Sequence, residues 1–178
     1  MIALLTHHSP MRHWLIKSEP EVFSIDDLAR VGREPWSGVR NYQARNFMWK
    51  EMHPGDLALF YHSNAQPPGV AGIAKVAGIP YPDATQFDGA SEYFDSKART
   101  GQPRWWLVDF DFVGRFREIL PLATLKADPL LAEMAVCQRG TRLSITPVTP
   151  AHFKRVCQLA GFALRFPIPV LAFPTNCG

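Results

Sequence analysis

The stretch Trp105-Trp-Leu-Val-Asp-Phe-Asp-Phe-Val113 carries the strongest secondary-structure signal in this chain. Its large apolar residues occupy alternate positions, at Trp106, Val108, Phe110 and Phe112. Alternate residues of a β-strand point to the same face of a sheet. The pattern therefore predicts a strand whose apolar face packs on the core of a sheet or barrel.

Shorter elements are predicted on both sides of this strand. Short apolar runs bounded by turn residues predict further strands at residues 13–17, 57–62, 70–76 and 143–148. Helices are expected at residues 25–31, 42–52, 121–126, 128–134 and 150–160, with Ser24, Asn41 and Thr149 capping three of them. Residues 78–104 have no clear periodicity. Because the strands and helices do not alternate regularly, we expect an α+β domain, built as a small mixed β-barrel with flanking short helices.

The size and charge of the chain set limits on its partners. Its 178 residues are about the length of one domain, predicted at residues 11–161, with an N-terminal extension at 1–10 and a loosely ordered C-terminal tail at 162–178. The net charge is only +3. Proteins that grip a long stretch of phosphate backbone usually carry a larger basic excess. If nucleic acid is the partner, we expect a small footprint and a discriminating pocket.

Several classes of function lack the sequence features that they need. The three cysteines, Cys137, Cys157 and Cys177, are widely spaced and odd in number, which predicts free thiols and a cytoplasmic location. No apolar run is long enough to cross a bilayer, so no membrane partner is expected. The sequence has no paired spacing of zinc ligands and no glycine motif for phosphates or dinucleotides. We expect neither a metal nor a cofactor.

The segment Trp36-Ser-Gly-Val-Arg-Asn-Tyr-Gln-Ala-Arg-Asn46 concentrates candidate ligand-binding side chains, namely Trp36, Asn41, Tyr42 and Arg45. Trp36 lies in a predicted loop, where its ring can stack on a base or fold back over the edge of the core. The other three fall at the start of a predicted helix, whose free backbone N–H groups also attract anions. The alternative is a capped amphipathic surface helix in which Arg45 pairs with an acid.

The remaining candidates lie at the ends of other predicted elements: Lys17, Ser18, Tyr61, His62, Ser63, Arg139 and Ser144. Ligand groups are common where a strand enters a loop. His62 shares a strand face with apolar residues, so it could instead be a histidine satisfied at the rim of the core. The basic residues could equally form a solvated face. His62 and Ser63 are neighbours on a strand and point to opposite faces, so we do not expect a nucleophile–base pair.

The mixture of side chains favours binding over catalysis. Aromatic faces, amides, arginines, a histidine and a serine suit a flat, polar ligand such as a nucleobase. The candidate stretches are poor in the acids, metal ligands and activated nucleophiles of enzymes. We therefore expect a base-reading module that is not an enzyme. Two alternatives stay open: an enzyme acting on a modified nucleoside with His62 as acid–base, and a small-molecule or anion-binding domain built on the helix cap at Asn41.

Seven blocks of the sequence, in order and with sensible spacing, resemble the EVE domain family; they are residues 14–20, 36–46, 54–56, 60–64, 81–83, 103–105 and 142–148. The resemblance runs from about Met11 to Gly161. It implies a PUA-like fold, a small mixed barrel with flanking helices that is related to the YTH and ASCH domains. It also implies that the pocket receives a modified base, 5-methylcytosine or a related nucleobase, extruded from DNA or RNA.

The resemblance implies roles for several candidates. Trp36 would form part of an aromatic wall, hydrogen bonds would come from Ser18, Asn41, Tyr42 and Ser63, and Arg45 and His62 would lie at or near the mouth. Two positions depart from the family pattern. Thr146 stands where Gln is expected, so the resemblance supplies no polar contact there. Trp49 stands where a basic residue is expected, which weakens the implied grip on the backbone.

Overall fold

The structure is a computed structural model that describes residues 11–164. The predicted extension at 1–10, and residues 165–178 of the predicted tail, lie outside the described residues. The strands in the described range are β1 (His13–Ser18), β2 (Arg33–Pro35), β3 (Leu57–His62), β4 (Gly69–Val76), β5 (Tyr81–Pro82), β6 (Trp106–Leu107), β7 (Asp109–Pro121) and β8 (Ile145–Val148). The helices are α1 (Ile25–Val31), α2 (Tyr42–Asn46), α3 (Leu122–Ala127) and α4 (Pro150–Leu159).

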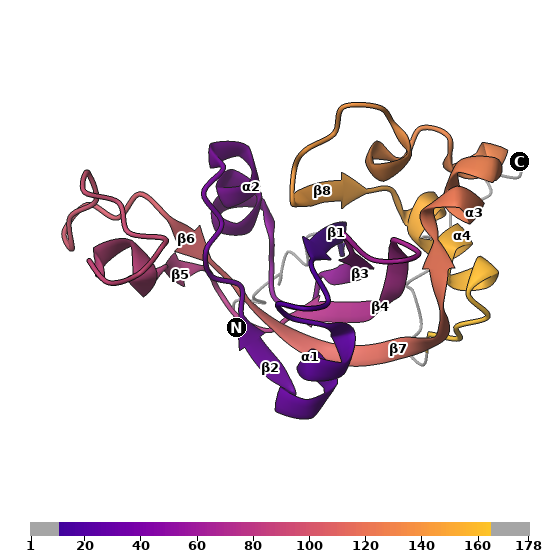
Figure 1. The fold of residues 1–178 in the computed structure, drawn as a ribbon, viewed down its shortest axis with the longest axis horizontal. Helices are drawn as coiled ribbons and strands as arrows, with labels where there is room; N and C mark the ends of the chain where they lie inside the picture. Colours follow the sequence, from indigo (N-terminus) through magenta and orange to yellow (C-terminus); the bar gives the residue numbers. More distant parts are fainter. Residues whose placement is uncertain (1–10, 165–178) are drawn as a thin grey trace, which may run out of the picture.

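Six of the strands form one curled sheet in the order β2-β7-β4-β3-β1-β8 (Figure 1). The β1–β3 pair is parallel and the other neighbours are antiparallel. β4 shifts register against both β3 and β7, and such bulges increase the local twist and curl a sheet. β5 and β6 form a small separate sheet that projects to the left in Figure 1, with α2 beside β6. This curled half-barrel with short helices confirms the predicted α+β class.

The curled sheet has an apolar core on each face. On β1, Trp14 and Ile16 belong to one core and Leu15 belongs to the other. On β3, Phe60 lies in the first core and Tyr61 in the second. Because both faces are covered, these strands read in the sequence as continuous apolar runs. The first core also contains Trp36, and it supports the candidate site.

The strand predicted at residues 105–113 is in fact two strands. β6 pairs with β5, whereas β7 pairs with β2 and β4, so the chain leaves one sheet and enters the other at Val108. The carbonyl of Val108 there accepts the backbone N–H of Trp36 at 3.0 Å. β7 also continues to Pro121, well past the predicted end, because its second half pairs with the start of β4. The short β2, which pairs with β7, was not predicted.

The predicted helix caps are confirmed. The hydroxyl of Ser24 accepts the N–H of Asp27 while the Asp27 carboxylate accepts the N–H of Ser24, which is the reciprocal capping box. The hydroxyl of Thr149 accepts the N–H of His152. The Asn41 side-chain oxygen likewise accepts two backbone N–H groups of α2. Local hydrogen bonding is thus sufficient to fix where these helices begin.

Helix lengths were predicted less well. The helix expected over residues 42–52 begins as predicted, but after Asn46 it continues as a π-helical turn (Phe47–Glu51). The prediction of a helix at 128–134 is wrong, because only a 3₁₀ turn (Pro129–Leu131) forms there. Further 3₁₀ turns occur at Ala84–Phe87 and Ala135–Cys137. Segments this short are decided by tertiary contacts more than by propensity.

The beginning of the predicted tail is packed. The ring of Phe162 lies 5.4 Å from that of Phe116, and it covers the second core. The prediction of a loosely ordered segment from residue 162 is therefore wrong at its start. Cys137 and Cys157 are free thiols, as predicted, while Cys177 lies outside the described residues. The cytoplasmic location inferred from the cysteines stays a prediction.

None of the helices within residues 11–164 combines the length and hydropathy that a bilayer span requires. In the same part of the chain, no group of three or more His, Cys, Asp or Glu side chains is placed to hold a metal ion.

Candidate functional site

A cavity of about 520 Å³ lies where the end of β1 meets β2 and the loop that follows β2. Residues 92–93, from the long segment between β5 and β6, and a residue just before β8 complete its wall. Four of the predicted site residues line it: Lys17, Ser18, Trp36 and Ser144. The fold thus brings together candidates that are far apart in the sequence.

Trp36 forms part of the cavity wall, but most of its ring belongs to the core. The residue is only 9% exposed. The rings of three phenylalanines, Phe23, Phe60 and Phe110, meet it edge to face, with centroids 6.4, 5.6 and 5.4 Å away. The alternative reading, that this ring folds over the edge of the core, therefore describes most of its surface. A small part remains to contact a ligand.

Tyr93 closes the side of the cavity that faces Gly38. Gly38 has a φ of +78°, a conformation that favours glycine. A Cβ atom at this position would lie 2.7 Å from the Tyr93 ring. The phenol ring therefore packs directly on bare backbone. Tyr93 comes from residues 78–104, where the sequence showed no periodicity, and it was not predicted as a site residue.

An ion pair holds this segment against the loop after β2. Arg40 donates to the Asp83 carboxylate at 2.9 Å, and the Asp83 side chain is only 2% exposed. Asp83 also accepts the backbone N–H of Gly38 at 3.0 Å and the hydroxyl of Thr85 at 2.6 Å. Burial by itself would raise the pKa of Asp83, but the hydrogen bonds from Arg40, Thr85 and Gly38 outweigh it and lower the pKa. Asp83 is therefore a charged anchor for the cavity wall.

The polar side chains of the cavity offer both donors and acceptors. Burial lowers the pKa of the Lys17 ammonium, which lies 3.4 Å from the carbonyl of Thr141. The Ser18 hydroxyl donates to the carbonyl of Phe23 at 2.7 Å and keeps its own lone pairs. Burial, and then the nearby charge of Asp109, raise the pKa of Glu34, which also lines the cavity. Such a lining can match a flat heterocycle with donors and acceptors on its edge.

The predicted residues on α2 lie outside this cavity. Asn41 uses its side-chain oxygen to cap the helix, as the alternative reading proposed. Tyr42 is 49% exposed and stacks on Trp105, with centroids 4.9 Å apart. Arg45 donates to the carbonyl of Arg104 at 2.6 Å, and no acid pairs with it among the described residues. These three side chains form a separate surface beside the cavity.

The predicted residues at the end of β3 support the structure and do not line the cavity. Tyr61 is buried in the second core, on the other face of the sheet from Trp36, which corrects its predicted place in the pocket. Nε2 of His62 accepts the backbone N–H of Ile25 at 3.1 Å. Burial lowers the pKa of His62, although Asp26 opposes this shift. His62 is thus the satisfied histidine of the alternative reading.

Two other predicted residues are also absent from the cavity wall. The backbone N–H of Ser63 donates to the carbonyl of Ser18 at 2.9 Å, so Ser63 supports the strand end that the cavity uses. Arg139 is exposed in the turn before β8. Sequence reasoning in turn missed Glu34, Arg40 and Tyr93. A signal existed for Arg40, because it and Asp83 fall in two of the blocks that resemble the EVE domain.

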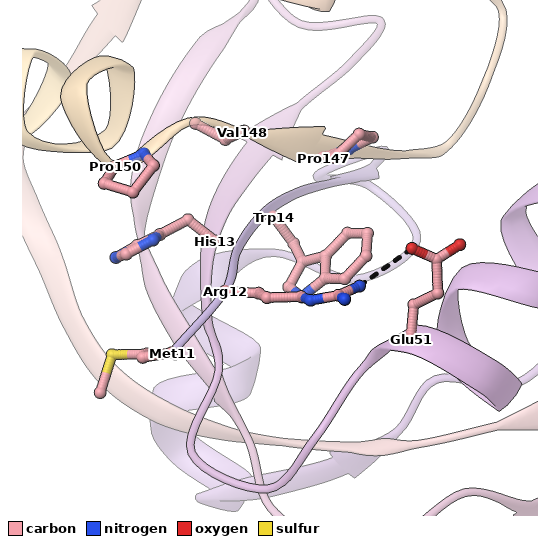
Figure 2. Close-up of a pocket in the computed structure, with 8 residues that line it drawn as sticks. All are labelled: Met11, Arg12, His13, Trp14, Glu51, Pro147, Val148 and Pro150. Atoms are coloured by element: carbon pink, nitrogen blue, oxygen red, sulfur yellow. Dashed lines mark hydrogen bonds and ion pairs between the residues drawn. The ribbon is translucent and has the colours of Figure 1, made fainter. Parts of the chain in front are cut away.

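A second cavity, of about 360 Å³, lies beside the start of β1 (Figure 2). Figure 2 shows the Arg12 guanidinium pairing with the Glu51 carboxylate, and Nη1 of Arg12 lies 3.0 Å from Oε2 of Glu51. The ring of His13 is buried, and burial lowers its pKa although Asp56 opposes this shift. Much of the remaining lining is apolar, including Met11 and Pro150. Because its two charged side chains satisfy each other, this cavity is less suited to a polar ring than the first.

Comparison with known proteins identifies the family. The model of the EVE domain matches residues 12–159. Thymocyte nuclear protein 1 of Gallus gallus is 42% identical over 166 residues, which cover 83% of this chain and 68% of that protein. A crystal structure of a protein from Pseudomonas syringae has 45% identity and a TM-score of 0.80, covering 83% of this chain and 99% of the other.

A structure of human THYN1 protein in complex with 5-methylcytosine-containing DNA is also similar to this chain. Its sequence identity is 40% and its TM-score is 0.79, with coverage of 86% of this chain and 99% of the human one. The likeness covers both the sequence blocks and the curled sheet described above. This chain belongs to the EVE domain family.

Proposed function

We propose that this protein binds DNA and receives a modified cytosine, such as 5-methylcytosine, in the cavity beside Trp36. The observation that carries the proposal is the coincidence of two facts. The cavity combines aromatic walls with hydrogen-bond donors and acceptors. A relative with the same fold was solved with DNA that contains this base. A volume of about 520 Å³ lies within the usual range for ligand pockets.

The base would enter the cavity edge-on after leaving its stack. Unstacking costs a few kcal/mol, and contacts with aromatic rings and hydrogen bonds to the base edge offset this cost. Tyr93 and the exposed part of Trp36 supply the aromatic contact. A carboxylate is the natural acceptor for the amino group of cytosine, and Glu34 is a carboxylate in the wall. Ser18 and Lys17 remain for the other polar atoms of the ring.

Recognition of the methyl group itself has a modest energetic limit. Burial of one methyl group contributes about 1 kcal/mol, which corresponds to about fivefold in affinity. Phe23 and Val39 are two apolar side chains of the wall that can accept it. We therefore expect discrimination of this size between 5-methylcytosine and cytosine. A larger ratio would mean that a polar group also reads the substituent.

The cavity supports binding better than catalysis. Its described lining contains serine hydroxyls but neither a histidine nor a cysteine, and the ammonium of Lys17 lies against the carbonyl of Thr141. His62, the acid–base of the enzymatic alternative, already uses Nε2 to accept the N–H of Ile25. We propose a reader and not an enzyme. DNA is preferred to RNA as the partner because the human relative was solved with DNA.

Binding to matched oligonucleotides tests the proposal. Fluorescence anisotropy would compare DNA strands that carry cytosine or 5-methylcytosine at one position, with RNA of the same sequence alongside. We expect tighter binding of the methylated DNA. Equal affinity for the two DNA strands, or turnover of the modified nucleoside, would contradict the proposal.

A pair of variants assigns the binding to this cavity. Glu34→Gln keeps the shape of the side chain but removes the charged acceptor, and we expect affinity for methylated DNA to fall about tenfold. Glu118→Gln is the matched control, because Glu118 is an exposed residue of β7 and the change in charge is the same. If the two variants bind alike, Glu34 does not contact the base.

A further inference from the structure

Beside the cavity lies an exposed group of stacked aromatic rings and cations, which we name the aromatic–cation surface. It consists of Tyr42, Arg45, Trp49, Lys50 and Arg104, supported from below by Trp105 and Trp106. These residues come from α2, from the π-helical turn after it, and from residues 104–106, where the chain enters β6. Figure 1 shows α2 and β6 side by side at this end of the molecule.

The aromatic rings of this surface are stacked in two pairs. Tyr42 lies on Trp105 with an interplanar angle of 21°, and Trp49 lies on Trp106 at 11° with centroids 5.0 Å apart. The outer member of each pair is accessible, since Tyr42 is 49% and Trp49 is 37% exposed. Large apolar rings held flat and open to solvent are an informative exception on a protein surface. They match the planar faces of unstacked bases.

Cations lie over the same rings. The guanidinium of Arg45 is 4.9 Å from the Tyr42 centroid and 5.5 Å from that of Trp49. The ammonium of Lys50 is 4.8 Å from the Trp49 centroid. The guanidinium of Arg104 also lies over Tyr42 and hydrogen-bonds its hydroxyl. Rings and cations therefore alternate across a small area.

These cations have little negative charge to balance them. Arg104 pairs with Asp95 at 3.2 Å, but neither Arg45 nor Lys50 has an acidic partner in the part of the chain that the structure describes. Arg45 instead donates to the carbonyl of Arg104 and to the side-chain oxygen of Asn46. Burial lowers the pKa of Arg45, and the positive charge of Arg104 adds to this effect while Tyr42 opposes it. An incoming anion would relieve this repulsion.

Arg40 connects this surface with the cavity wall. The guanidinium of Arg40 lies 5.3 Å from the Trp105 centroid, below Tyr42, and 5.4 Å from the centroid of Tyr93. Tyr93 and Arg40 line the cavity. A strand that places one base in the cavity therefore has this surface within reach of its neighbouring nucleotides.

We propose that the aromatic–cation surface binds the nucleotides next to the base in the cavity, on the same DNA strand. A flanking base stacks on Trp49 or Tyr42, and backbone phosphates bind Arg45 and Lys50. This inference rests on the proposed function and adds to it a second, sequence-independent contact. It also gives Trp49 a role. A basic residue at this position would bind the backbone phosphates, whereas in this chain the Trp49 ring binds a base and the neighbouring Lys50 binds a phosphate.

The first test varies the length of the strand. Wild-type protein should bind a single strand of about ten nucleotides with a central 5-methylcytosine much more tightly than the mononucleotide of 5-methyldeoxycytidine, which has no neighbouring nucleotides. Trp49→Ala should weaken binding of this strand about tenfold and leave binding of the mononucleotide nearly unchanged. Trp49→Phe, which keeps a ring, should recover most of the loss and guards against a folding defect. Leu130→Ala, at another exposed apolar side chain, is the control and should change nothing.

The second test concerns the phosphate contacts. Lys50→Gln should reduce the dependence of log affinity on log salt by about 0.7, the value for one phosphate contact to a single strand. Lys154→Gln removes the same charge from an exposed position on α4 and should leave the salt dependence unchanged.

The failure of this inference differs from failure of the proposed function. If methylated DNA is preferred but Trp49→Ala and Lys50→Gln behave as their controls do, the surface does not bind the strand and the cavity still reads the base. If wild-type protein shows no preference for the modified base, the proposed function fails first. The inference stands only if both variants weaken binding while the ratio of affinities for methylated and unmethylated strands is kept.

Discussion

The guanidinium of Arg40 and the carboxylate of Asp83 lie 2.9 Å apart, although they are 43 positions apart in the sequence. This pair attaches the segment between β5 and β6 to the loop after β2. Both parts contribute to the cavity wall, so the pair holds the cavity together. The Asp83 carboxylate also accepts the backbone N–H groups of Gly38 and Thr85, which belong to the same two segments.

Loss of Asp83 should therefore destabilise the protein strongly. Asp83→Ala leaves the largely buried Arg40 without its anion, and breaking such a pair costs about 3–5 kcal/mol. Urea denaturation would measure the change in the free energy of unfolding. Asp26→Ala is the control, because Asp26 pairs with Arg115 in an exposed position where a salt bridge contributes less than about 1 kcal/mol. Similar losses for the two variants would mean that the Arg40–Asp83 pair has no special role.

His62 should contribute stability that depends on pH. Its Nε2 accepts the buried N–H of Ile25, so His62→Ala leaves that donor unsatisfied and should cost about 2 kcal/mol at pH 7.5. Burial lowers the pKa of folded His62 below the unfolded value of 6.5. The unfolded chain therefore binds the proton more readily, and the stabilisation is complete above that value and lost as the pH falls through the lowered pKa.

Thermal or urea unfolding at pH 7.5 and at lower pH would check this prediction. The advantage of the wild type over His62→Ala should shrink on acidification. Some pH dependence should remain in the variant, since burial also lowers the pKa of His13. His62→Gln keeps an acceptor for Ile25 and should be less sensitive to pH. An advantage of the wild type that stays constant or grows in acid would contradict this account.

Trp36 is predicted to matter more for folding than for base selection. Three phenylalanines surround its ring, so Trp36→Ala should leave a large hole in the first core and cost about 3–5 kcal/mol of unfolding free energy. Trp49→Ala, the same substitution at a ring that is 37% exposed, should cost only about 1–2 kcal/mol. Chemical denaturation of the two variants would show equal losses if Trp36 were instead a free stacking platform.

Local patterns in the sequence were sufficient to predict much of the fold. The caps at Ser24, Asn41 and Thr149 depend on hydrogen bonds between residues two or three positions apart, so the sequence alone contains them. The buried strands β1 and β3 are recognisable in the sequence as apolar runs. The division of residues 105–113 into β6 and β7 was missed, because Val108 interacts with the distant Trp36 and no local pattern records this contact.

The candidate site was predicted only in part for a similar reason. Residue type identified Lys17, Ser18 and Ser144 at element ends that do meet at the cavity. Tyr61 was misplaced because its strand is buried on both faces, so an apolar run could not reveal which face it occupies. Tyr93 was missed because its place depends on the Arg40–Asp83 pair and on a glycine that leaves room for its ring.

That glycine provides the sharpest test of the cavity. Gly38→Ala introduces a Cβ atom 2.7 Å from the Tyr93 ring at a positive φ, so both the ring and the backbone must shift. Gly55→Ala is a matched control, because Gly55 also has a positive φ, +96°, but nothing lies within 4 Å of the added atom. Each variant should lose about 1–2 kcal/mol of unfolding free energy from the backbone strain alone.

Only Gly38→Ala should also impair recognition of the base. With Tyr93 displaced from the wall, we expect affinity for methylated DNA to fall about tenfold and the preference over unmethylated DNA to shrink, because one aromatic contact is lost. Anisotropy titrations at a temperature where both variants are fully folded would separate this effect from stability. If Gly55→Ala weakens binding as much as Gly38→Ala does, the loss reflects backbone strain, and the Tyr93 wall does not determine how the base is held.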